Sequence, residues 1–391
     1  MNETRGRDES SSIGQETSAV LQGVRSEAQR KPRTESGTVW SIAVGAMLLA
    51  VAALPAPALA GFTCGGTVGP GGTAVMATDI NQCASNPVLT IVGPVTVDMA
   101  GHHVECRDFV ANAGIRIIGQ GAVVKNGFVY PGCEHQIVLD GSGHHEVHDM
   151  AGHQAGNLLS GTPIASILVL SDYNVVRNSL AALSSNDGIR VGGHHNVIKE
   201  NYVVINARDG VRVVGTSNTI KDNIVTLSGA DAFNLTPGAD ANTVSGNYAI
   251  SNNGVGFRTV TNGSWFSGNS SVGNASGFIF AAGDDGVTGG GNRIQGNNAI
   301  YNQGPVSGEV IGGGFLIREK DDIVNGNRAI FNAFWNDLAG IHVMKPGSEH
   351  VIAGNTSLFH GATDLTDETA GCGTDHWSNN VFLLRNQACI H

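Results

Sequence analysis

The chain has 391 residues, of which 55 are glycine and 14% are charged, and it carries a formal net charge of −11. Residues 1–37 hold six basic and six acidic residues, so the negative excess belongs to the rest of the chain. This balance argues against generic nucleic-acid binding, which needs a basic surface. Low charge and abundant glycine are typical of tight corners and buried strands, and one elongated domain can hold this length.

The first segment, residues 1–37, is rich in Ser, Glu, Arg and Gln, and this composition predicts a disordered leader. Residues 38–60 predict a signal peptide, because basic residues precede the apolar run Ser41–Leu54 and the small residues Ala58–Ala60 form a cleavage site. The sequence therefore predicts a single domain over residues 61–391 that is secreted, periplasmic or held at the cell surface.

A membrane anchor is the alternative interpretation of the same apolar run. The run is shorter than the ~20 residues that a spanning helix needs, and Pro55 and Pro57 follow it. We therefore expect no stable membrane span after the signal is cleaved.

Six cysteines follow the expected cleavage site, and they lie only toward the two ends of the domain: Cys64, Cys83, Cys106, Cys133, Cys372 and Cys389. An even count in an exported chain predicts disulfides, although six cysteines allow about 15 connectivities. Pairing between sequence neighbours would join Cys64 to Cys83, Cys106 to Cys133 and Cys372 to Cys389, and would brace the ends of a repeat domain. A zinc site is the alternative, but the chain has no Cys-x-x-Cys pair.

One short pattern, Asn-x-(Ile/Val)-x-x-Asn, recurs through the second half of the chain. Clear copies start at Asn196, Asn218 and Asn242. Looser copies start at His145, Asn174, Ser264, Asn292, Asp322 and His350. A period of roughly 20 to 30 residues is the mark of a solenoid, in which each repeat buries its apolar face by stacking on its neighbours.

Two files of apolar residues are expected to line the inside of this solenoid. The third residue of every motif copy is apolar: Val147, Val176, Ile198, Ile220, Val244, Phe266, Ile294, Val324 and Ile352. A second file precedes it on another strand: Ile189, Val211, Phe233, Phe257, Phe278, Phe315 and Ile341. Polar and apolar residues alternate around both files, which is the period of a strand.

The second asparagine of the motif forms a further column: Asn201, Asn223, Asn247, Asn269, Asn297, Asn327 and Asn355. Stacked amides can hydrogen-bond from coil to coil, and asparagine tolerates the left-handed backbone of a corner. These residues resemble the right-handed parallel β-helix repeat family, the pectin-lyase-like superfold, over roughly residues 85–390. We therefore expect an all-β, right-handed parallel β-helix solenoid of roughly nine to ten coils.

A histidine-rich segment opens the motif region. If Val147 points inward, His144, Glu146 and His148 alternate onto the outer face. Two imidazoles and a carboxylate are credible ligands for a transition metal such as copper, and periplasmic copper-handling proteins with this fold exist. The alternative is that this segment only shapes a corner.

A band of acidic and basic residues lies on the strand before the motif. Asp-Gly-Ile-Arg and Asp-Gly-Val-Arg repeat 22 residues apart, and the next coil continues in phase. We call this the aspartate–arginine band. It comprises Asp187, Arg190, Asp209, Arg212 and Asp231, with Arg258 one coil further along.

Outward arginines in this band could grip the carboxylates of an acidic sugar chain. The resemblance to β-helix polysaccharide lyases implies further that aspartates hold calcium while a basic residue removes a proton beside the uronate. The simpler interpretation is that each aspartate shapes its corner and pairs with the nearby arginine.

Longer coils toward the C-terminus add acidic residues to the list of candidate substrate contacts: Asp284, Asp285 and Glu319. Insertions in solenoids often cluster on the binding face. Gly283–Gly286 and His360-Gly361 are similar to two polygalacturonase motifs, but the other two motifs are absent or out of order.

The sequence thus favours a polysaccharide-binding β-helix, which could also cleave its ligand as a lyase or a hydrolase. A non-catalytic carbohydrate-binding or surface-structural protein is the first alternative, and a periplasmic copper-handling protein is the second. Whether the protein is an enzyme stays open, because no complete catalytic motif is present and the fold supports many chemistries.

Overall fold

The computed structural model describes residues 62–107, 111–156, 164–281, 289–302, 313–332, 339–345 and 349–391. The predicted leader and signal peptide therefore lie outside the described residues. Within the described part of the chain, no helix combines the length and apolarity needed to cross a bilayer. The only helical element there is one short 3-10 turn, η1 (Ala370–Cys372).

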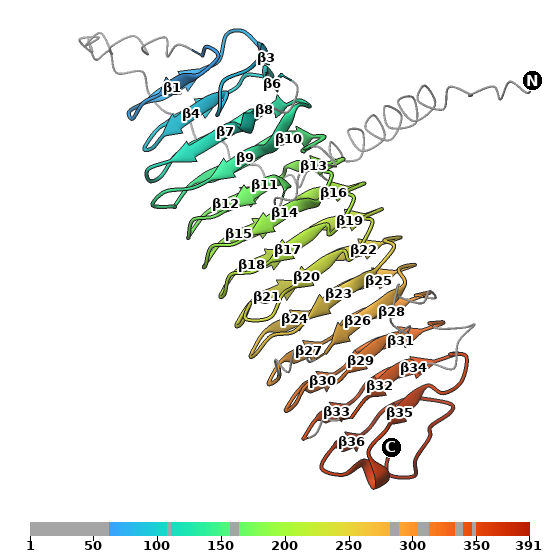
Figure 1. Cartoon of the computed structure of the whole chain (residues 1–391). Helices are drawn as coiled ribbons and strands as arrows, with labels where there is room; N and C mark the ends of the chain where they lie inside the picture. The colour runs from blue at the N-terminus through green and yellow to red at the C-terminus, as the bar shows by residue number, and fades with distance from the viewer. Residues whose placement is uncertain are drawn as a thin grey trace, which may run out of the picture. The chain divides into compact units, whose positions relative to one another are not determined.

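Three rows of short parallel strands build the solenoid (Figure 1). We call the first row the long sheet. It contains β1 (Gly66–Val68), β4 (Leu89–Val92), β7 (Ala111–Ile118), β9 (Cys133–Leu139), β11 (Ala165–Val169), β14 (Asp187–Val191), β17 (Val211–Val213), β20 (Phe233–Leu235), β23 (Val255–Thr259), β26 (Ser276–Phe280), β29 (Phe315–Ile317), β32 (Ile341–Val343) and β35 (Leu365–Asp367).

The second row carries the repeated pattern and is called the motif row. It contains β2 (Thr73–Val75), β5 (Thr96–Asp98), β8 (Val123–Val129), β10 (Glu146–His153), β12 (Val175–Arg177), β15 (Val197–Lys199), β18 (Thr219–Lys221), β21 (Thr243–Ser245), β24 (Trp265–Ser267), β27 (Arg293–Gln295), β30 (Ile323–Asn325), β33 (Val351–Ala353) and β36 (His376–Ser378).

The remaining strands are called the third row, which the long strands β8 and β10 also join by their second halves. Its other members are β3 (Ile80–Cys83), β6 (His103–Cys106), β13 (Leu180–Ala182), β16 (Tyr202–Val204), β19 (Ile224–Thr226), β22 (Tyr248–Ile250), β25 (Ser270–Val272), β28 (Asn298–Ile300), β31 (Arg328–Ile330) and β34 (Thr356–Leu358).

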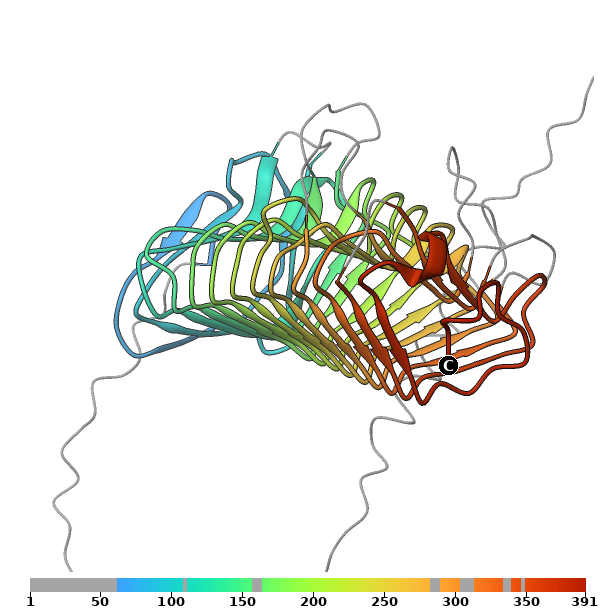
Figure 2. The same ribbon diagram turned by 90° about the horizontal axis from the view of Figure 1, so that it is seen from below.

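The solenoid is an all-β parallel helix of the predicted kind, but it has about 12 turns rather than nine to ten. Figure 2 shows these turns one behind another around a common interior. The first turns, built on β1, β4 and β7, lack the asparagine motif. Counting motif copies therefore undercounts the turns at the N-terminal end.

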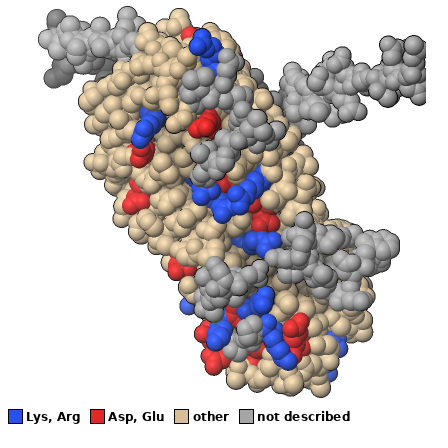
Figure 3. Space-filling model, in the orientation of Figure 1, with Lys and Arg blue, Asp and Glu red and all other residues tan. Residues whose placement is uncertain are grey.

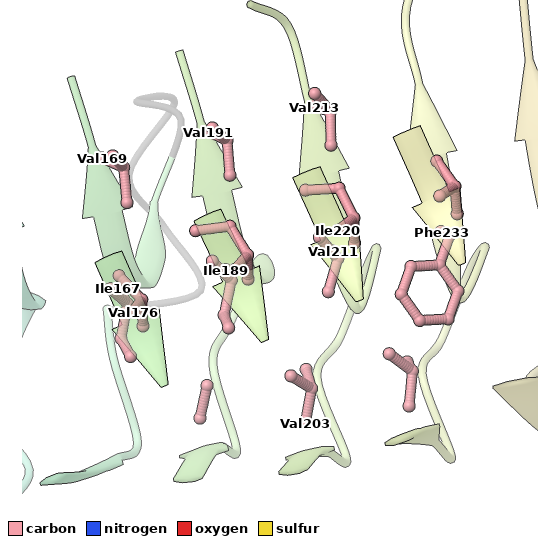
Figure 4. Packing of buried hydrophobic residues seen from close by; sticks show 14 of the residues in the cluster. Ile167, Val169, Val176, Ile189, Val191, Val203, Val211, Val213, Ile220 and Phe233 are labelled. Atoms are coloured by element: carbon pink, nitrogen blue, oxygen red, sulfur yellow. The ribbon is translucent and has the colours of Figure 1, made fainter. Parts of the chain in front are cut away.

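Both predicted apolar files line the interior, as Figure 4 shows for Ile189, Val211 and Phe233 of one file and for Val176 and Ile220 of the other. Every member of the two files is at most 1% exposed. Each residue lies in register with the equivalent residue one turn away. The stacked aromatic rings of the second file lie 4.7 Å apart, which is the spacing of neighbouring strands.

The predicted asparagine column forms a continuous hydrogen-bonded ladder inside the corner after the motif row. The amide Nδ2 of Asn223 donates to Oδ1 of Asn247 over 3.0 Å, and Asn247 repeats this contact with Asn269. Each Oδ1 also accepts the backbone N–H of the residue one turn earlier. The ladder thus satisfies backbone groups that the corner leaves without strand partners.

The left-handed backbone conformation lies one residue earlier than the sequence suggested. Positive φ angles occur at Glu200, Asp222 and Gly246, each of which immediately precedes a ladder asparagine. The expectation that the asparagines themselves take this conformation is therefore wrong. The asparagine side chain points inward to bond along the solenoid, while its neighbour makes the turn.

We expect Asn247→Ala to lower the free energy of unfolding by about 3 kcal/mol or more. The change deprives the N–H and Nδ2 of Asn223 of their acceptor and the carbonyl of Ile220 of its donor, and unsatisfied buried groups cost about 1–3 kcal/mol each. Asn253→Ala, at an exposed asparagine six residues on, is the control and should change stability by less than about 0.5 kcal/mol. Urea unfolding measures both, and equal effects would contradict a stabilising role for the ladder.

Three disulfides join the six cysteines as sequence neighbours, Cys64 to Cys83, Cys106 to Cys133 and Cys372 to Cys389. Two of them lie in the first turns and one in the last. Trp377 closes the last turn, where it is 3% exposed and its indole N–H donates to Asp367 over 2.9 Å. The two ends of the solenoid are therefore braced covalently.

Candidate functional site

The aspartate–arginine band lies on the long sheet across β14, β17, β20 and β23. Because Ile189 and Val211 point inward, the next residues, Arg190 and Arg212, point outward in register with each other. The same outward file continues through Asn234 to Arg258. The strand period in the sequence correctly predicted this alignment.

The three aspartates of the band are buried, which the sequence did not indicate. Asp187 is 0% exposed, Asp209 is 1% and Asp231 is 6%. They lie two residues before the apolar file, near the N-terminal ends of β14, β17 and β20, and their carboxylates are enclosed although they contact side chains in the outward register. A polymer on the surface would therefore meet the arginines and not these carboxylates.

Each aspartate of the band accepts a hydrogen bond from an arginine. Oδ2 of Asp187 accepts from Nη1 of Arg190 over 3.3 Å, and Asp209 accepts from Arg212 over the same distance. These contacts within one strand match the simpler interpretation, in which the aspartate pairs with its nearby arginine. Asp231 instead accepts from Nε of Arg258 over 2.7 Å, which links two successive turns.

Hydrogen bonds to neighbouring turns fix the aspartates further. Oδ2 of Asp209 also accepts from Nδ2 of Asn234 over 2.9 Å, and Oδ1 of Asp231 accepts the N–H of Val255 over 2.8 Å. Oδ1 of Asp209 accepts the N–H of Asp231 over 3.3 Å, so the band from Asp209 to Arg258 is one connected network across three turns, and Asp187 with Arg190 forms a separate pair beside it. Such a network holds the guanidinium groups in place before any ligand arrives.

Burial raises the pKa of Asp187, Asp209 and Asp231 above the ordinary value, and the nearby guanidinium groups oppose this shift. At Asp209 the charge of Asp187 adds to the effect of burial. Exposed Arg208, which is next to Asp209 in the sequence, also opposes this increase in the pKa of Asp187 and Asp209 through its positive charge. The sequence analysis missed Arg208, although its position next to the second band aspartate was a usable signal.

The arginine side chains reach solvent. Arg190, Arg212 and Arg258 are 21%, 18% and 22% exposed. Figure 3 shows that Lys and Arg gather in the middle of this face, over the region that Figure 1 labels β14 to β23. A guanidinium offers five N–H donors, and the aspartate contact occupies one Nη1 of Arg190 and one of Arg212.

Two small apolar clusters lie on either side of the band along the long sheet. Val138 and Leu168 belong to the first, and Ile279 and Leu316 to the second. They share the outward register of the arginines. The basic segment of this face is therefore confined to about four turns.

The three predicted metal ligands of the histidine-rich segment do not point toward a common position. The carboxylate of Glu146 accepts from Arg177 over 2.8 Å, and Nδ1 of His148 lies 2.6 Å from Asp149. His144 stacks on Tyr173 with ring centroids 5.0 Å apart. The three predicted metal ligands therefore have three separate partners.

Across the described residues, no three His, Cys, Asp or Glu side chains are placed to hold a metal ion. This applies to the predicted calcium ligands in the band as well as to the histidine-rich segment. In the described structure neither set of residues is gathered into a group of three ligands, and metal binding by either stays a prediction.

The three predicted substrate contacts in the C-terminal turns have different outcomes. Asp284 and Asp285 lie outside the described residues. Glu319 is only 1% exposed, so a polymer on the surface could not contact it. Its Oε2 accepts from Nδ2 of Asn292 over 2.5 Å, and its Oε1 has no hydrogen-bond partner in the described structure.

Glu319 belongs to a buried group of titratable side chains that the sequence analysis missed. Burial raises the pKa of Glu319 to about 9 and that of Asp322 to about 7, and it lowers the pKa of His350 to about 4. Asp322 and His350 occupy the first motif slot, which is asparagine in most other turns. The replacement of asparagine by a titratable residue in this slot was therefore the sequence signal that could have revealed the buried group.

Solved structures with the same fold include two polysaccharide lyases. One is a mannuronic acid specific family 6 lyase from human gut microbiota, with 10% identity and a TM-score of 0.52 over 82% of each chain. The other is a mutant of the family 6 alginate lyase AlyGC, with 13% identity and a TM-score of 0.53 over 81% of this chain and 48% of that one. At these identities the likeness establishes the fold alone.

No curated protein sequence matches the chain. A family model described as periplasmic copper-binding protein (NosD) matches residues 114–310, which is half of the chain. The matched segment contains both the histidine-rich segment and the aspartate–arginine band. By this match the chain belongs to the NosD family of parallel β-helix proteins.

Proposed function

We propose that this protein binds an acidic polysaccharide along the outer face of β14, β17, β20 and β23. The observation that carries the proposal is a register of partly exposed arginines, each held in place by a buried aspartate. Neighbouring strands lie about 4.8 Å apart, so Arg190 and Arg212 present two guanidinium groups at short range. Preorganised guanidinium groups bind carboxylates with two parallel hydrogen bonds.

The two structural neighbours act on mannuronic acid polymers or alginate, so polyuronates are the first ligands to test. Binding is the function proposed here. Cleavage would require a base that can reach the substrate, and the buried aspartates of the band are out of reach of a polymer on the surface. The arginines stay charged, and their role is to hold and neutralise carboxylates.

The test removes the arginines without leaving a buried charge. Removing one partner of a buried pair costs about 3–5 kcal/mol, so each arginine is changed together with its aspartate. The variant carries Asp187→Asn, Arg190→Gln, Asp209→Asn and Arg212→Gln, and its net charge is unchanged. We expect its affinity for polygalacturonate or alginate to fall at least about tenfold, since each charged hydrogen bond contributes about 1.5–3 kcal/mol.

A matched control makes the same exchange on another face. Lys199→Gln with Glu200→Gln, and Lys221→Gln with Asp222→Asn, remove two cations and two anions from the motif row and the corner after it. Calorimetric titration should show unchanged affinity for this control and no binding of neutral glucans by the wild type. Equal weakening by both variants would refute the site, and absence of polyuronate binding would refute the function.

The same samples distinguish the remaining alternatives. A lyase would release unsaturated products that absorb in the ultraviolet, and a hydrolase would release reducing ends. Tight copper binding that is lost on His148→Ala, with no response to glycans, would favour the metal-handling function that the family description suggests. A purely structural protein would show none of these responses.

A further inference from the structure

The outer face of the third row carries no charge over six successive turns. The strands β13, β16, β19, β22, β25 and β28, with the corner residue that follows each, contain no Lys, Arg, Asp or Glu. They run along the right-hand edge of the solenoid in Figure 1. We call this surface the neutral face.

Large apolar side chains project from the neutral face into solvent. Ile224 is 39% exposed, and Tyr248 and Ile250 on the next strand are 49% and 37% exposed. The corner residues Ile205 and Leu227 are 38% and 53% exposed. Register places Ile224 beside Tyr248, so the exposed apolar side chains of these two strands are neighbours.

In the first three turns of this face the corner residues are unlike those of a comparable corner in the same turns, whereas Ser251 and Gly273 occupy the corner after β22 and β25. Leu183, Ile205 and Leu227 have positive φ angles, in which bulky and branched residues are uncommon. The corner after the motif row requires the same conformation and uses Glu200 and Asp222 there, or else asparagine and glycine. Local geometry therefore does not call for apolar residues at the third-row corner.

The same corner column runs from Tyr301, the last corner residue of the neutral face, to two further residues toward the C-terminus. Tyr301, Phe331 and Phe359 also have positive φ angles, and their rings stack on one another with centroids 5.2 Å and 5.1 Å apart. Stacking covers the ring faces and leaves mainly edges for a ligand. This arrangement suits apolar packing better than stacking on a sugar ring.

We propose that the neutral face is the contact between two copies of this chain. An apolar sheet face is complementary to itself, as a two-fold interface requires, and sheets pack face to face at about 10 Å. Two copies that each carry a net charge of −11 repel one another, and this effect is smallest where neither surface is charged. The arrangement leaves the aspartate–arginine band open on another face.

Other partners fit this surface less well. A bilayer-binding face usually adds Lys or Arg to attract anionic lipid, and these strands have none. A glycan site needs several polar groups that fix orientation, and the outer side chains of this face are mostly Ile, Leu, Val and Tyr, with few polar groups among them. A second copy needs only apolar surface.

The area of the neutral face sets the expected affinity between the two copies. Six strands about 4.8 Å apart and about four residues wide outline roughly 400 Å² in plan. Exposed apolar patches of roughly this size or larger mark interaction sites. Two copies would bury roughly 800 Å² in plan, which is small for a permanent dimer and suits a reversible one.

Sedimentation equilibrium on the full chain tests the proposal. We expect a monomer–dimer equilibrium with a Kd of roughly 10–100 μM, as an interface of this size allows. The double variant Ile205→Asn with Leu227→Asn should raise the Kd at least about tenfold. Asparagine tolerates positive φ, so the variant should keep its fold, and circular dichroism checks this.

The matched control is Tyr173→Asn, which removes an equally exposed apolar residue of the same backbone conformation from a different corner. It should leave the Kd unchanged. A wild-type chain that stays monomeric at about 100 μM would overturn the proposal, as would equal Kd values for the wild type and the double variant. Binding of the monomer to zwitterionic vesicles through the same two residues would assign the face to lipid and would also overturn it.

Discussion

Ile220→Asp should prevent the protein from folding. Ile220 lies in the middle of β18, is 0% exposed, and is in register with Ile198 and Val244 on the neighbouring turns. The change removes about 1.5–3 kcal/mol of apolar burial and places a carboxyl group where no partner exists, which costs several kcal/mol more. That sum is comparable with the whole stability of a typical domain, about 5–15 kcal/mol.

Lys221→Ala is the control for this prediction. Lys221 is the next residue, its side chain is 54% exposed, and its Nζ lies 3.6 Å from the Asp222 carboxylate. An exposed pair of this kind contributes about 0–1 kcal/mol, so the variant should fold and unfold like the wild type. Far-ultraviolet circular dichroism and soluble yield measure both variants. If Ile220→Asp folded as well as Lys221→Ala, the inward assignment of this file would be wrong.

Stability should fall as the pH rises from 7 to 9, chiefly because of Glu319. The folded pKa of Glu319 is raised to about 9, whereas a free glutamate titrates near 4.5. Over the intervening range the folded state holds a proton that the unfolded state has released, so its advantage shrinks as the pH rises. The slope reaches up to about 1.4 kcal/mol per pH unit and ends near pH 9.

The groups around Glu319 set its pKa, and that pKa sets the pH range over which stability falls. Besides burial, the charges of Asp322 and Asp240 raise its pKa, while hydrogen bonds from Thr261 and Asn292 lower it. Asp322 adds to the loss of stability only up to its own folded pKa of about 7. Buried His350 acts in the opposite direction, because its lowered pKa removes stability as the pH falls from 6.5 toward about 4.

Glu319→Gln should abolish most of this decline. Glutamine cannot ionise and keeps a carbonyl oxygen to accept from Asn292. The urea midpoint of the variant should therefore exceed that of the wild type by an amount that grows between pH 7 and pH 9. Glu349→Gln removes an exposed carboxylate next to His350 and should leave the wild-type slope intact. Parallel pH profiles for Glu319→Gln and the wild type would contradict the assignment.

The candidate site was only partly predictable. Alternation along β14 and β17 placed Arg190 and Arg212 outward and in register, because the inward neighbours Ile189 and Val211 are strongly apolar. Nothing in the residue pattern indicated that Asp187 is fully buried, because an Asp-Gly pair is typical of an exposed turn. Burial there depends on the long-sheet strands of neighbouring turns.

The amino-acid sequence by itself determined the repeat length, the two inward files and the asparagine ladder. It favoured pairing between neighbouring cysteines, and the structure decided that pairing. In a solenoid each residue contacts its equivalent one period away. The contacts can therefore be predicted directly from the repeat period of the sequence. The number of turns did not follow, because the first turns pack by the same geometry without the asparagine motif.

Only the tertiary structure decided which polar side chains are buried and which apolar ones are exposed. Glu319 and Ile205 illustrate the two cases, since the former is enclosed and the latter projects into solvent. The exposure of a side chain depends on how the corners of successive turns stack and on which row it joins. Those are relations between turns that the residue types do not encode singly.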